Sequence, residues 1–410
     1  MNWDLKRDLE SVRKEFPILE RCVYLISNSL GAVPRKAEEH LRRFYSLWAE
    51  DGVSAWRKEW WELSRKIGNQ VAFLLGANID EVTMLASATL CHWVALSTKF
   101  PVGRRGDDRR NRIIVTDHDF PSMLYAVSKI SEFMGWELEL VKSHGEPGID
   151  AENIIKEIDD RTLFVATSHV YFKSAFIQNI QRIAARAREV GALTLIDGYH
   201  APGTLPVDVK QLDVDFYVGG CLKWLCGGPG NAFLYVKPEL ADTLQPRLTG
   251  WFAHREPFLF AQDMDYARGS YKFMSGTPPV PSLYTARAGL EIIKKIGIQQ
   301  IRKKSLALTE SILEEAKERG FHLYTPEDKE IRGGAVSFSL PQAFPVKQAL
   351  EQRGVKVDFR KGEDKEPDIL RIGPHFYSKE EEIDILFQEI EAIYASGEHK
   401  KFSDDIRHVT

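Results

Sequence analysis

Cysteine is scarce in this chain and is not spaced for disulfide or metal chemistry. The 410 residues include only four cysteines, at positions 22, 91, 221 and 226. They form no C-x-x-C pair and show no His/Cys spacing of a metal site. This usage suits a reducing compartment better than a disulfide framework. We therefore expect neither a structural zinc site nor any other bound metal.

The chain also lacks a strong net charge and long apolar runs. Lys and Arg number 55 against 59 Asp and Glu, a net charge of −4, and no basic face indicates nucleic-acid binding. The arginine-rich run at 103–112 contains two aspartates, which favours a solvated loop. No apolar run approaches a membrane span, and residues 1–15 have no apolar signal-peptide core. We expect a cytoplasmic protein with neither a nucleic-acid nor a membrane partner.

The pattern that is present predicts an α/β fold. Hydrophobic residues make up 43% and charged residues 28% of the chain, as in ordinary soluble globular proteins, and the length allows two domains. From residue 80 to 235, short aliphatic runs alternate with helical stretches, which predicts a largely parallel central sheet with helices on both faces. The predicted strands include 81–85, 113–116, 163–166 and 193–197. Later helices with strands at 335–340 and 369–372 predict a smaller α+β domain.

Three segments follow from this pattern. We expect residues 1–50 to form an N-terminal segment that joins the small domain. We expect residues 51–282 to form the large domain and residues 283–410 to form the small C-terminal domain. Tryptophans at 48, 56, 60 and 61 are most simply explained by packing in a core or subunit interface. A platform for a substrate ring is the alternative.

Lys223 stands in the middle of the sequence G-G-C-L-K-W-L-C-G-G-P-G, residues 219–230. Its neighbours are cysteines, leucines and a tryptophan, so burial is expected, and burial favours the neutral amine. A neutral lysine is a nucleophile that can form a Schiff base with an aldehyde. On this stretch alone, a lysine extending from a half-buried turn is an equal alternative.

Asp197 ends an aliphatic run, 193–196, which lies upstream of Lys223. Such a run predicts a buried parallel strand that brings its last side chain to the carboxyl edge of the sheet, where open α/β sheets bind ligands. An aspartate that keeps a pyridine nitrogen protonated and a lysine that holds an aldehyde are what pyridoxal phosphate chemistry requires. The two residues together predict an enzyme whose cofactor is pyridoxal 5'-phosphate.

Two strand-to-helix loops carry further candidates. Ala88 and Thr89 follow the strand at 81–85, and small residues at a helix N-terminus can bind a phosphate through free backbone N–H groups. A plain Ser or Thr N-cap is the alternative. Phe120 lies in the next loop of this kind, where its ring could stack on a flat cofactor.

Motifs along nearly the whole chain resemble those of the kynureninase-like group of class V, fold-type I pyridoxal phosphate-dependent enzymes. The strand aspartate and loop lysine are shared by many such enzymes, whereas the C-terminal motifs are more specific to kynureninases. The motifs are Y-L-I-S-N-S-L-G-A-V-P at 24–34, F-P-S at 120–122, D-G-Y-H at 197–200, L-K-W-L-C-G-G-P-G at 222–230, G-W-F-A-H at 250–254, S-G-T-P-P at 275–279, I-R-K-K-S-L-A-L-T at 301–309, R-G-V-K-V-D-F-R at 353–360 and P-D-I-L-R-I-G at 367–373.

The resemblance implies a role for each matching residue. Lys223 would hold the cofactor aldehyde and Asp197 would pair with the pyridinium nitrogen, so both are predicted to be catalytic. Arg371 would bind the substrate carboxylate through its planar guanidinium. The other implied cofactor contacts are Ala88, Thr89, Phe120, Ser168, His200, Trp251 and Thr277, and the other implied substrate contacts are Asn28 and Ser29. Sites of this family are built between two subunits, so a homodimer is expected, with Trp251 or Thr277 reaching the partner's cofactor phosphate.

Three positions depart from the family pattern. Leu222 replaces the tyrosine that immediately precedes the lysine, where the phenol reaches the phosphate and is placed for proton transfer. Met123 replaces the acid of F-P-S/T-D, and Tyr199 replaces the alanine of D-x-A-H. Together these departures weaken the expectation of an unchanged substrate and reaction.

The resemblance implies a hydrolase that cleaves the Cβ–Cγ bond of a 4-oxo amino acid such as kynurenine. A class V aminotransferase or a β-eliminating lyase acting on another amino acid is the alternative, because the first steps are common to all three. A cysteine desulfurase is disfavoured because no cysteine follows Cys226. A non-catalytic pyridoxal phosphate-binding regulator is disfavoured because the sequence shows no added DNA-binding domain.

Overall fold

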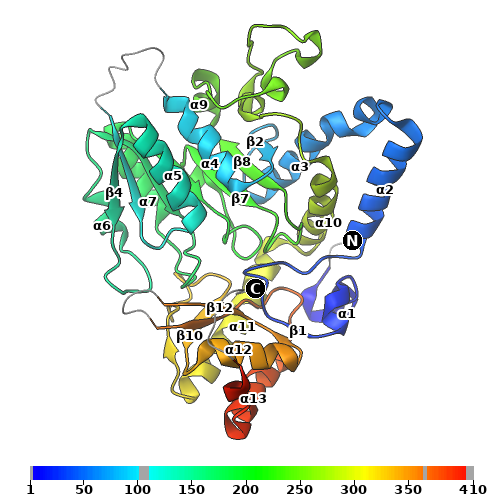
Figure 1. The fold of residues 1–410 in the computed structure, drawn as a ribbon, viewed down its shortest axis with the longest axis vertical. Helices are drawn as coiled ribbons and strands as arrows, with labels where there is room; N and C mark the ends of the chain where they lie inside the picture. Colours follow the sequence, from blue (N-terminus) through cyan, green and yellow to red (C-terminus); the bar gives the residue numbers. More distant parts are fainter. Residues whose placement is uncertain (1–2, 101–109, 363–366, 403–410) are drawn as a thin grey trace.

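A seven-stranded sheet forms the centre of the molecule, and the computed structural model describes residues 3–100, 110–362 and 367–402 (Figure 1). The strand order is β2-β8-β7-β6-β5-β3-β4. Neighbouring strands are parallel except at β8, which is antiparallel to both β2 and β7. The strands are β2 (Val82–Leu85), β3 (Arg112–Thr116), β4 (Glu137–Val141), β5 (Thr162–Ser168), β6 (Leu193–Asp197), β7 (Phe216–Gly220) and β8 (Ala232–Val236). The predicted mostly parallel α/β sheet is confirmed.

Helices cover both faces of this sheet, which is why β5, β6, β7 and β8 are buried along their whole length. Successive residues of a strand face opposite sides. Ile113 and Val115 pack with α4 and α5, whereas Ile114 packs with α6 and α7. The helices of this region are α3 (Trp61–Leu74), α4 (Ala88–Leu96), α5 (Pro121–Met134), α6 (Ala151–Ile155), α7 (Ile180–Val190), α8 (Val209–Leu212), α9 (Pro238–Thr243) and α10 (Val280–Ile296).

A second, smaller sheet lies in the lower part of Figure 1 and is antiparallel, with strand order β12-β13-β10-β9. Helices α11, α12 and α13 share its hydrophobic core. The strands are β9 (His322–Leu323), β10 (Val336–Ser339), β12 (Asp358–Arg360) and β13 (Ile369–Ile372). The helices are α11 (Ile298–Glu318), α12 (Ala343–Gln352) and α13 (Glu381–Ser396).

The N-terminal residues contact both parts of the molecule. Strand β1 (Val23–Tyr24) pairs in parallel with β11 (Val355–Lys356), and Arg13, at the end of α1 (Leu5–Arg13), forms a 2.8 Å ion pair with Glu382. Helix α2 (Lys36–Asp51) instead packs along α10. The predicted domain boundaries at residues 50 and 282 stay predictions.

Short helical turns connect these elements. A π-helical turn immediately precedes α3. Among the described residues, no helix is long and apolar enough to cross a membrane. The turns are η1 (Pro17–Glu20), η2 (Trp56–Trp60), η3 (Ser97–Lys99), η4 (Trp251–Ala253), η5 (Pro257–Leu259), η6 (Gly269–Phe273) and η7 (Glu398–Lys401).

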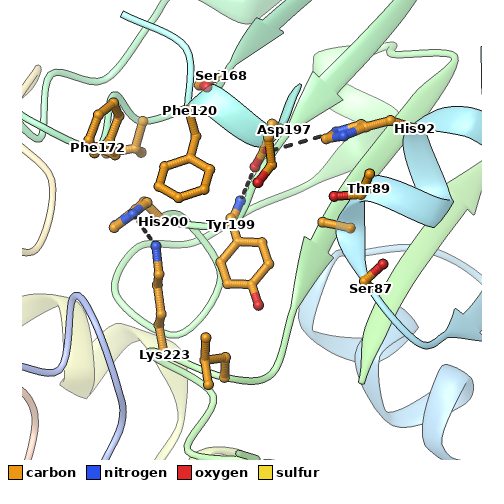
Figure 2. Close-up of a pocket in the computed structure, with 14 residues that line it drawn as sticks. Ser87, Thr89, His92, Phe120, Ser168, Phe172, Asp197, Tyr199, His200 and Lys223 are labelled. Atoms are coloured by element: carbon orange, nitrogen blue, oxygen red, sulfur yellow. Dashed lines mark hydrogen bonds and ion pairs between the residues drawn. The ribbon is translucent and has the colours of Figure 1, made fainter. Parts of the chain in front are cut away.

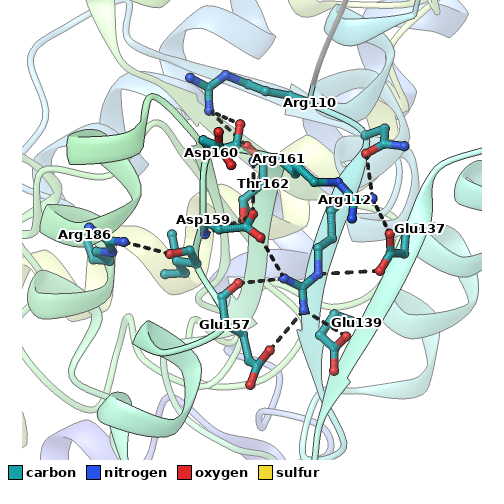
Figure 3. Close-up of polar contacts among 12 residues, drawn as sticks. Arg110, Arg112, Glu137, Glu139, Glu157, Asp159, Asp160, Arg161, Thr162 and Arg186 are labelled. Carbon is teal, nitrogen blue, oxygen red and sulfur yellow. Dashed lines mark hydrogen bonds and ion pairs between the residues drawn. The ribbon is translucent and has the colours of Figure 1, made fainter.

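Arg112 joins β3 to its neighbours at the amino edge of the large sheet (Figure 3). Its guanidinium forms ion pairs of 2.9 Å with Glu139, 3.0 Å with Glu157 and 3.3 Å with Asp159. Several acids around one half-buried arginine hold this edge together more effectively than isolated surface pairs. Arg110 also donates hydrogen bonds to the backbone carbonyls of Asp160 and Thr162, so both arginines at the end of the predicted solvated loop contact the edge of the sheet. Residues 103–109 of that loop lie outside the described residues.

The tryptophan cluster packs against other aromatic rings. Trp60 stacks on Phe44 with ring centres 5.3 Å apart, and Trp56 meets Trp60 edge-to-face at 5.4 Å. Trp61 packs on Phe252 at 4.5 Å. The four tryptophans of this cluster do not line the pocket around Lys223 of their own chain, which fits the packing interpretation, and the substrate-platform alternative stays a prediction.

Candidate active site

A pocket of about 220 Å³ opens at the carboxyl ends of β5 and β6, beside the N-terminus of α4 (Figure 2). The last side chains of parallel strands lie at this carboxyl edge of the sheet, where open α/β sheets bind ligands. The lining residues are Ser87, Ala88, Thr89, His92, Phe120, Ser122, Ser168, Val170, Phe172, Asp197, Tyr199, His200, Leu222 and Lys223. The pocket thus brings together the predicted residues Ala88, Thr89, Phe120, Ser168, Asp197, His200 and Lys223.

Lys223 enters the pocket from the loop after β7. Its Nζ lies 2.7 Å from Nε2 of His200, 4.9 Å from the ring centre of Tyr199 and 5.4 Å from that of Phe120. Burial, together with the positive charge of Arg371, lowers the pKa of Lys223 to about 7. A large share of the amine is therefore neutral at pH 7, as a nucleophile requires. Burial and Lys223 likewise hold the pKa of His200 well below its usual range, so its imidazole is neutral.

Asp197 is the last residue of β6 and is only 6% exposed. Its Oδ1 accepts a 2.8 Å hydrogen bond from the backbone N–H of Tyr199. Its Oδ2 lies 3.6 Å from Nε2 of His92, as the dashed lines in Figure 2 mark. One carboxylate oxygen is thus held by the backbone, while the other has no hydrogen bond among the described residues.

The N-terminus of α4 is suited to a phosphate. Ser87 is the N-cap, and its hydroxyl accepts a 3.3 Å hydrogen bond from the N–H of Leu90. The backbone N–H groups of Ala88 and Thr89 have no partner inside the helix, because the first turn of any helix leaves them free. The N-cap alternative therefore holds for Ser87, and it leaves two donors and the positive end of the helix dipole facing the pocket.

These residues fit pyridoxal phosphate. The pocket contains a nucleophilic amine at Lys223, a carboxylate at Asp197, a ring at Phe120 that is 37% exposed, and a helix N-terminus for an anion. Each group of the cofactor, namely aldehyde, pyridine nitrogen, flat ring and phosphate, has a matching partner. Among the described residues, no three His, Cys, Asp or Glu side chains are grouped to hold a metal ion.

Asp119 was not predicted and lies directly behind the pocket. Its Oδ1 accepts hydrogen bonds from the N–H and hydroxyl of Ser168 at 2.6 and 2.8 Å, and its Oδ2 accepts them from Thr116 at 2.8 and 2.9 Å. Burial raises the pKa of Asp119 to about 7, although these hydrogen bonds oppose the shift. Because Ser168 donates its hydroxyl proton to Asp119, it faces the pocket as an acceptor. The acid at position 119 precedes Phe120 in sequence, but its burial between two strands has no sequence signal.

The departures from the family pattern have different surroundings. Leu222 and Tyr199 both line the pocket, so both replacements alter its wall. Burial raises the pKa of the Tyr199 phenol. Met123 is fully buried in the core between the sheet and α4 and does not line the pocket. The missing acid of the F-P-S/T-D motif is therefore replaced by a packing residue.

Phe172 is another pocket residue without a motif, and it connects the pocket to Arg371. Its ring meets that of Phe120 edge-to-face at 5.2 Å, and the guanidinium carbon of Arg371 lies 5.7 Å from its ring centre. His92 and Ser122 also line the pocket and were not predicted. His92 follows Thr89 by three positions in α4, and Ser122 follows Phe120 by two positions at the start of α5. The periodicity of a helix could have indicated which of these residues face inward.

Arg371, Asn28 and Ser29 meet beside the pocket rather than in its lining. Arg371 is 1% exposed, and its Nη1 donates a 2.5 Å hydrogen bond to Asp358, which also accepts one of 2.7 Å from the hydroxyl of Ser29. Within the described part of the chain, Nε and Nη2 of Arg371 and the side-chain amide of Asn28 are buried without a partner. Burial lowers the pKa of Arg371 to about 10, so the guanidinium stays charged at neutral pH. Buried donors without partners leave hydrogen-bonding capacity that an acceptor such as a carboxylate could satisfy.

Trp251 and Thr277 do not line the pocket of their own chain. Trp251 is 37% exposed and packs beside Trp61 with ring centres 5.9 Å apart, and Thr277 is exposed. Their predicted contact with a partner subunit's cofactor stays a prediction.

Known proteins similar to this chain agree with the geometry. Residues 23–386 match the family model described as Aminotransferase class-V. Kynureninase from Pseudomonas fluorescens is 32% identical over 379 residues, which cover 90% of this chain and 88% of that protein. Kynureninase from Burkholderia mallei (strain SAVP1) is 31% identical over 380 residues, with the same shares of the two chains covered.

Solved structures similar to this chain show the fold. The apo structure of a cysteine desulfurase from Thermococcus onnurineus NA1 has a TM-score of 0.82 at 22% identity and covers 94% of this chain and 98% of that one. A mutant of the protein C-DES, with glycine covalently linked to its PLP cofactor, has a TM-score of 0.82 at 20% identity and covers 92% and 98%. The family model spans most of the chain and the kynureninases exceed 30% identity, so this chain belongs to the aminotransferase class-V family of pyridoxal phosphate-dependent enzymes.

Proposed function

We propose that this enzyme is a kynureninase-like hydrolase that cleaves the Cβ–Cγ bond of a 4-oxo amino acid such as kynurenine. The observation that carries the proposal is the pocket in which Lys223 and Asp197 meet beside the buried guanidinium of Arg371. The similarity to kynureninases over 90% of the chain supports the choice of reaction. When bound, pyridoxal phosphate stores the electrons released as a bond to the substrate's α-carbon breaks.

Lys223 is proposed to act twice. Its neutral amine would hold the cofactor through the aldehyde, and as a free amine it would take the α-proton of the substrate. Its pKa of about 7 suits a base that works near neutral pH. The neutral imidazole of His200, 2.7 Å away, holds Nζ in position. The carboxylate of Asp197 would accept a hydrogen bond from the pyridinium N–H and so keep that nitrogen protonated.

The remaining pocket residues are proposed to bind and orient. Phe120 stacks on the cofactor ring, and Ser168, fixed by Asp119, lines the cofactor. The N–H groups of Ala88 and Thr89 bind the phosphate. On the substrate side, Nε and Nη2 of Arg371 bind the α-carboxylate in a bidentate manner, and Asn28 and Ser29 line the same site. A carboxylate there would also satisfy donors that are otherwise buried and unpaired.

Product analysis tests the proposed reaction. The holoenzyme is incubated with kynurenine and with a panel of other amino acids, and aromatic acid, alanine, keto acids and ammonia are measured. We expect anthranilate and alanine in equal amounts from kynurenine. Keto acid without anthranilate would identify an aminotransferase, and ammonia with a keto acid would identify a lyase. Cofactor binding without turnover of any amino acid would favour a regulator, so only the first result supports the proposal.

A β-eliminating lyase is the second candidate because of Leu222. The aliphatic side chain lines the pocket and cannot transfer a proton, whereas a β-elimination needs only the base Lys223 and the cofactor. A desulfurase-type thiol is not favoured. Cys91, Cys221 and Cys226 are buried, and burial raises the pKa of each thiol, to about 12 at Cys221.

Leu222→Tyr is expected to raise the rate of anthranilate release by about 10²-fold or more, because it restores a phenol that can act as an acid or base. Exchange of the α-proton with solvent, which needs only Lys223 and the cofactor, should change little. Leu222→Phe is the matched control, since it adds the ring without the hydroxyl. Equal rates in the Tyr and Phe variants would contradict this role. If Tyr199→Phe abolishes hydrolysis instead, the phenol of Tyr199 supplies the proton.

The functional unit is proposed to be a homodimer with shared sites. Trp251 and the exposed apolar residues Phe258, Leu259 and Phe260 lie on one protruding segment, which lies at the top of Figure 1, and they have no contact with their own pocket. Exposed apolar side chains gathered in one place are typical of an interaction surface. A partner subunit's pocket is where the resemblance puts Trp251 and Thr277.

Subunit mixing tests whether the sites are shared. Lys223→Ala and Thr277→Asp variants, each inactive alone, are unfolded together, refolded and assayed. Random pairing makes half of the dimers mixed, with one intact site of two, so about a quarter of the wild-type activity should return. Differently tagged subunits confirm that exchange has occurred. Exchange without recovered activity would mean that each site is complete within one chain.

A further inference from the structure

His92 has a position that no motif accounts for. It lies on α4, about one turn after Ala88 and Thr89, and its imidazole points into the pocket beside Asp197 (Figure 2). The residue is 1% exposed, and neither ring nitrogen has a hydrogen-bond partner among the described residues. Its Nε2 lies 3.6 Å from Oδ2 of Asp197. A buried polar side chain without a partner is costly, so its presence calls for a role.

The surroundings of His92 limit that role. Burial lowers the pKa of the imidazole and the charge of Asp197 opposes the shift, so the ring is neutral at pH 7. A neutral imidazole has one N–H donor and one acceptor nitrogen. Oδ2 of Asp197 lies 3.6 Å from Nε2 of His92, and it is not the oxygen that accepts from the N–H of Tyr199, which is Oδ1. A hydrogen bond from His92 to Oδ2 would hold the carboxylate from a different direction than the hydrogen bond from Tyr199 to Oδ1.

We propose that His92 is a positioning residue: in the cofactor-bound enzyme its Nε2–H, 3.6 Å from Oδ2 of Asp197 in this structure, closes to hydrogen-bond distance and fixes the carboxylate towards the pyridine nitrogen of the cofactor. The inference rests on the proposed role of Asp197. A carboxylate held only at Oδ1 can rotate about its Cβ–Cγ bond, so its direction would be less well defined. The imidazole removes that freedom without adding a charge that would compete with the pyridinium. Residues that do not contact a ligand themselves commonly orient, through a hydrogen bond, a residue that does.

The experiment measures cofactor binding and not turnover. Apoenzyme forms of the wild type, His92→Leu, Asp197→Asn and the double variant are titrated with pyridoxal phosphate, and the dissociation constant and visible absorption maximum are recorded. His92→Leu should weaken binding about tenfold, the effect of one hydrogen bond to a charged group. It should also move the absorption maximum in the same direction as Asp197→Asn. In the Asp197→Asn background, His92→Leu should add little, because its partner is already changed.

His92→Gln is the matched conservative variant, since the glutamine amide nitrogen can take the place of Nε2 and keeps a donor on the same side of Asp197. It should restore most of the affinity and the wild-type absorption maximum. Equal losses from His92→Leu in both backgrounds would overturn the proposal and assign His92 to packing. A wild-type affinity and spectrum in His92→Leu would overturn it as well. If His92→Leu does not fold, a failure of His92→Gln to bind like the wild type decides against the proposal.

The outcome also separates this inference from the proposed function. If Asp197→Asn leaves affinity and absorption unchanged, the role of Asp197 itself is wrong. If Asp197→Asn alters both but His92→Leu alters neither, only the inference about His92 is wrong. The reaction catalysed does not enter either result, since no substrate is present.

Discussion

Lys223→Ala is expected to lower turnover by at least about 10⁴-fold, because the variant loses both the amine that binds the cofactor and the base for the α-proton. Borohydride treatment of the wild type should fix pyridoxal phosphate to the peptide that contains Lys223, and the variant should lose its cofactor on gel filtration. Lys272→Ala is the matched control. Lys272 is also buried with a lowered pKa but lies outside the pocket, so its removal should leave cofactor attachment intact.

A reduced peptide that maps to another lysine, or full cofactor retention in Lys223→Ala, would contradict this prediction. The pH dependence offers a second check. The protonated amine is not a nucleophile, so cofactor uptake by the apoenzyme should be fast above the pKa of Lys223, about 7. Below that pH the rate should fall by about tenfold per unit, as the neutral fraction does. Stopped-flow absorbance at a series of pH values measures this profile.

Arg371→Lys is expected to raise KM for α-amino acid substrates by about 100-fold, because lysine keeps a positive charge near Asp358 but loses the planar, bidentate donor pair. This variant is preferred to Arg371→Ala, which would leave the buried Asp358 without a 2.5 Å partner and risk unfolding. A substrate analogue that lacks the α-carboxylate is the matched ligand. It should bind the wild type and the variant alike when binding is followed by cofactor absorbance.

An unchanged KM, or an equal loss of affinity for the analogue without a carboxylate, would remove Arg371 from substrate binding. Arg371→Ala, where it folds, allows a further measurement. The positive charge of Arg371 lowers the pKa of Lys223, so its removal should move the inflection of cofactor uptake to higher pH. A shift to lower pH would contradict the electrostatic coupling between the two residues.

The sequence by itself determined the parts of the site that depend on local order. The aliphatic run that ends at Asp197 forms β6, as predicted. Ala88 and Thr89 begin α4 directly after a strand-to-helix loop, and Phe120 ends the next such loop as the N-cap of α5. Strand periodicity, helix starts and the carboxyl edge of a parallel sheet are local or topological rules, so they can be read along the chain. The motifs around Lys223 then indicated the cofactor and the family.

Only the tertiary structure decided which side chains meet across long separations. Arg371 and Asp358 pair with Ser29, which comes from the other end of the chain, and Asp119 joins Ser168 across two strands. His92 follows the phosphate loop in an apolar helix, where its sequence context predicts only burial. Only the structure shows that both ring nitrogens of His92 lack a hydrogen-bond partner among the described residues and that Nε2 lies 3.6 Å from Oδ2 of Asp197. Hydrogen bonding in a buried site depends on distances and directions between segments, and these are set by packing of the whole fold rather than by any local pattern.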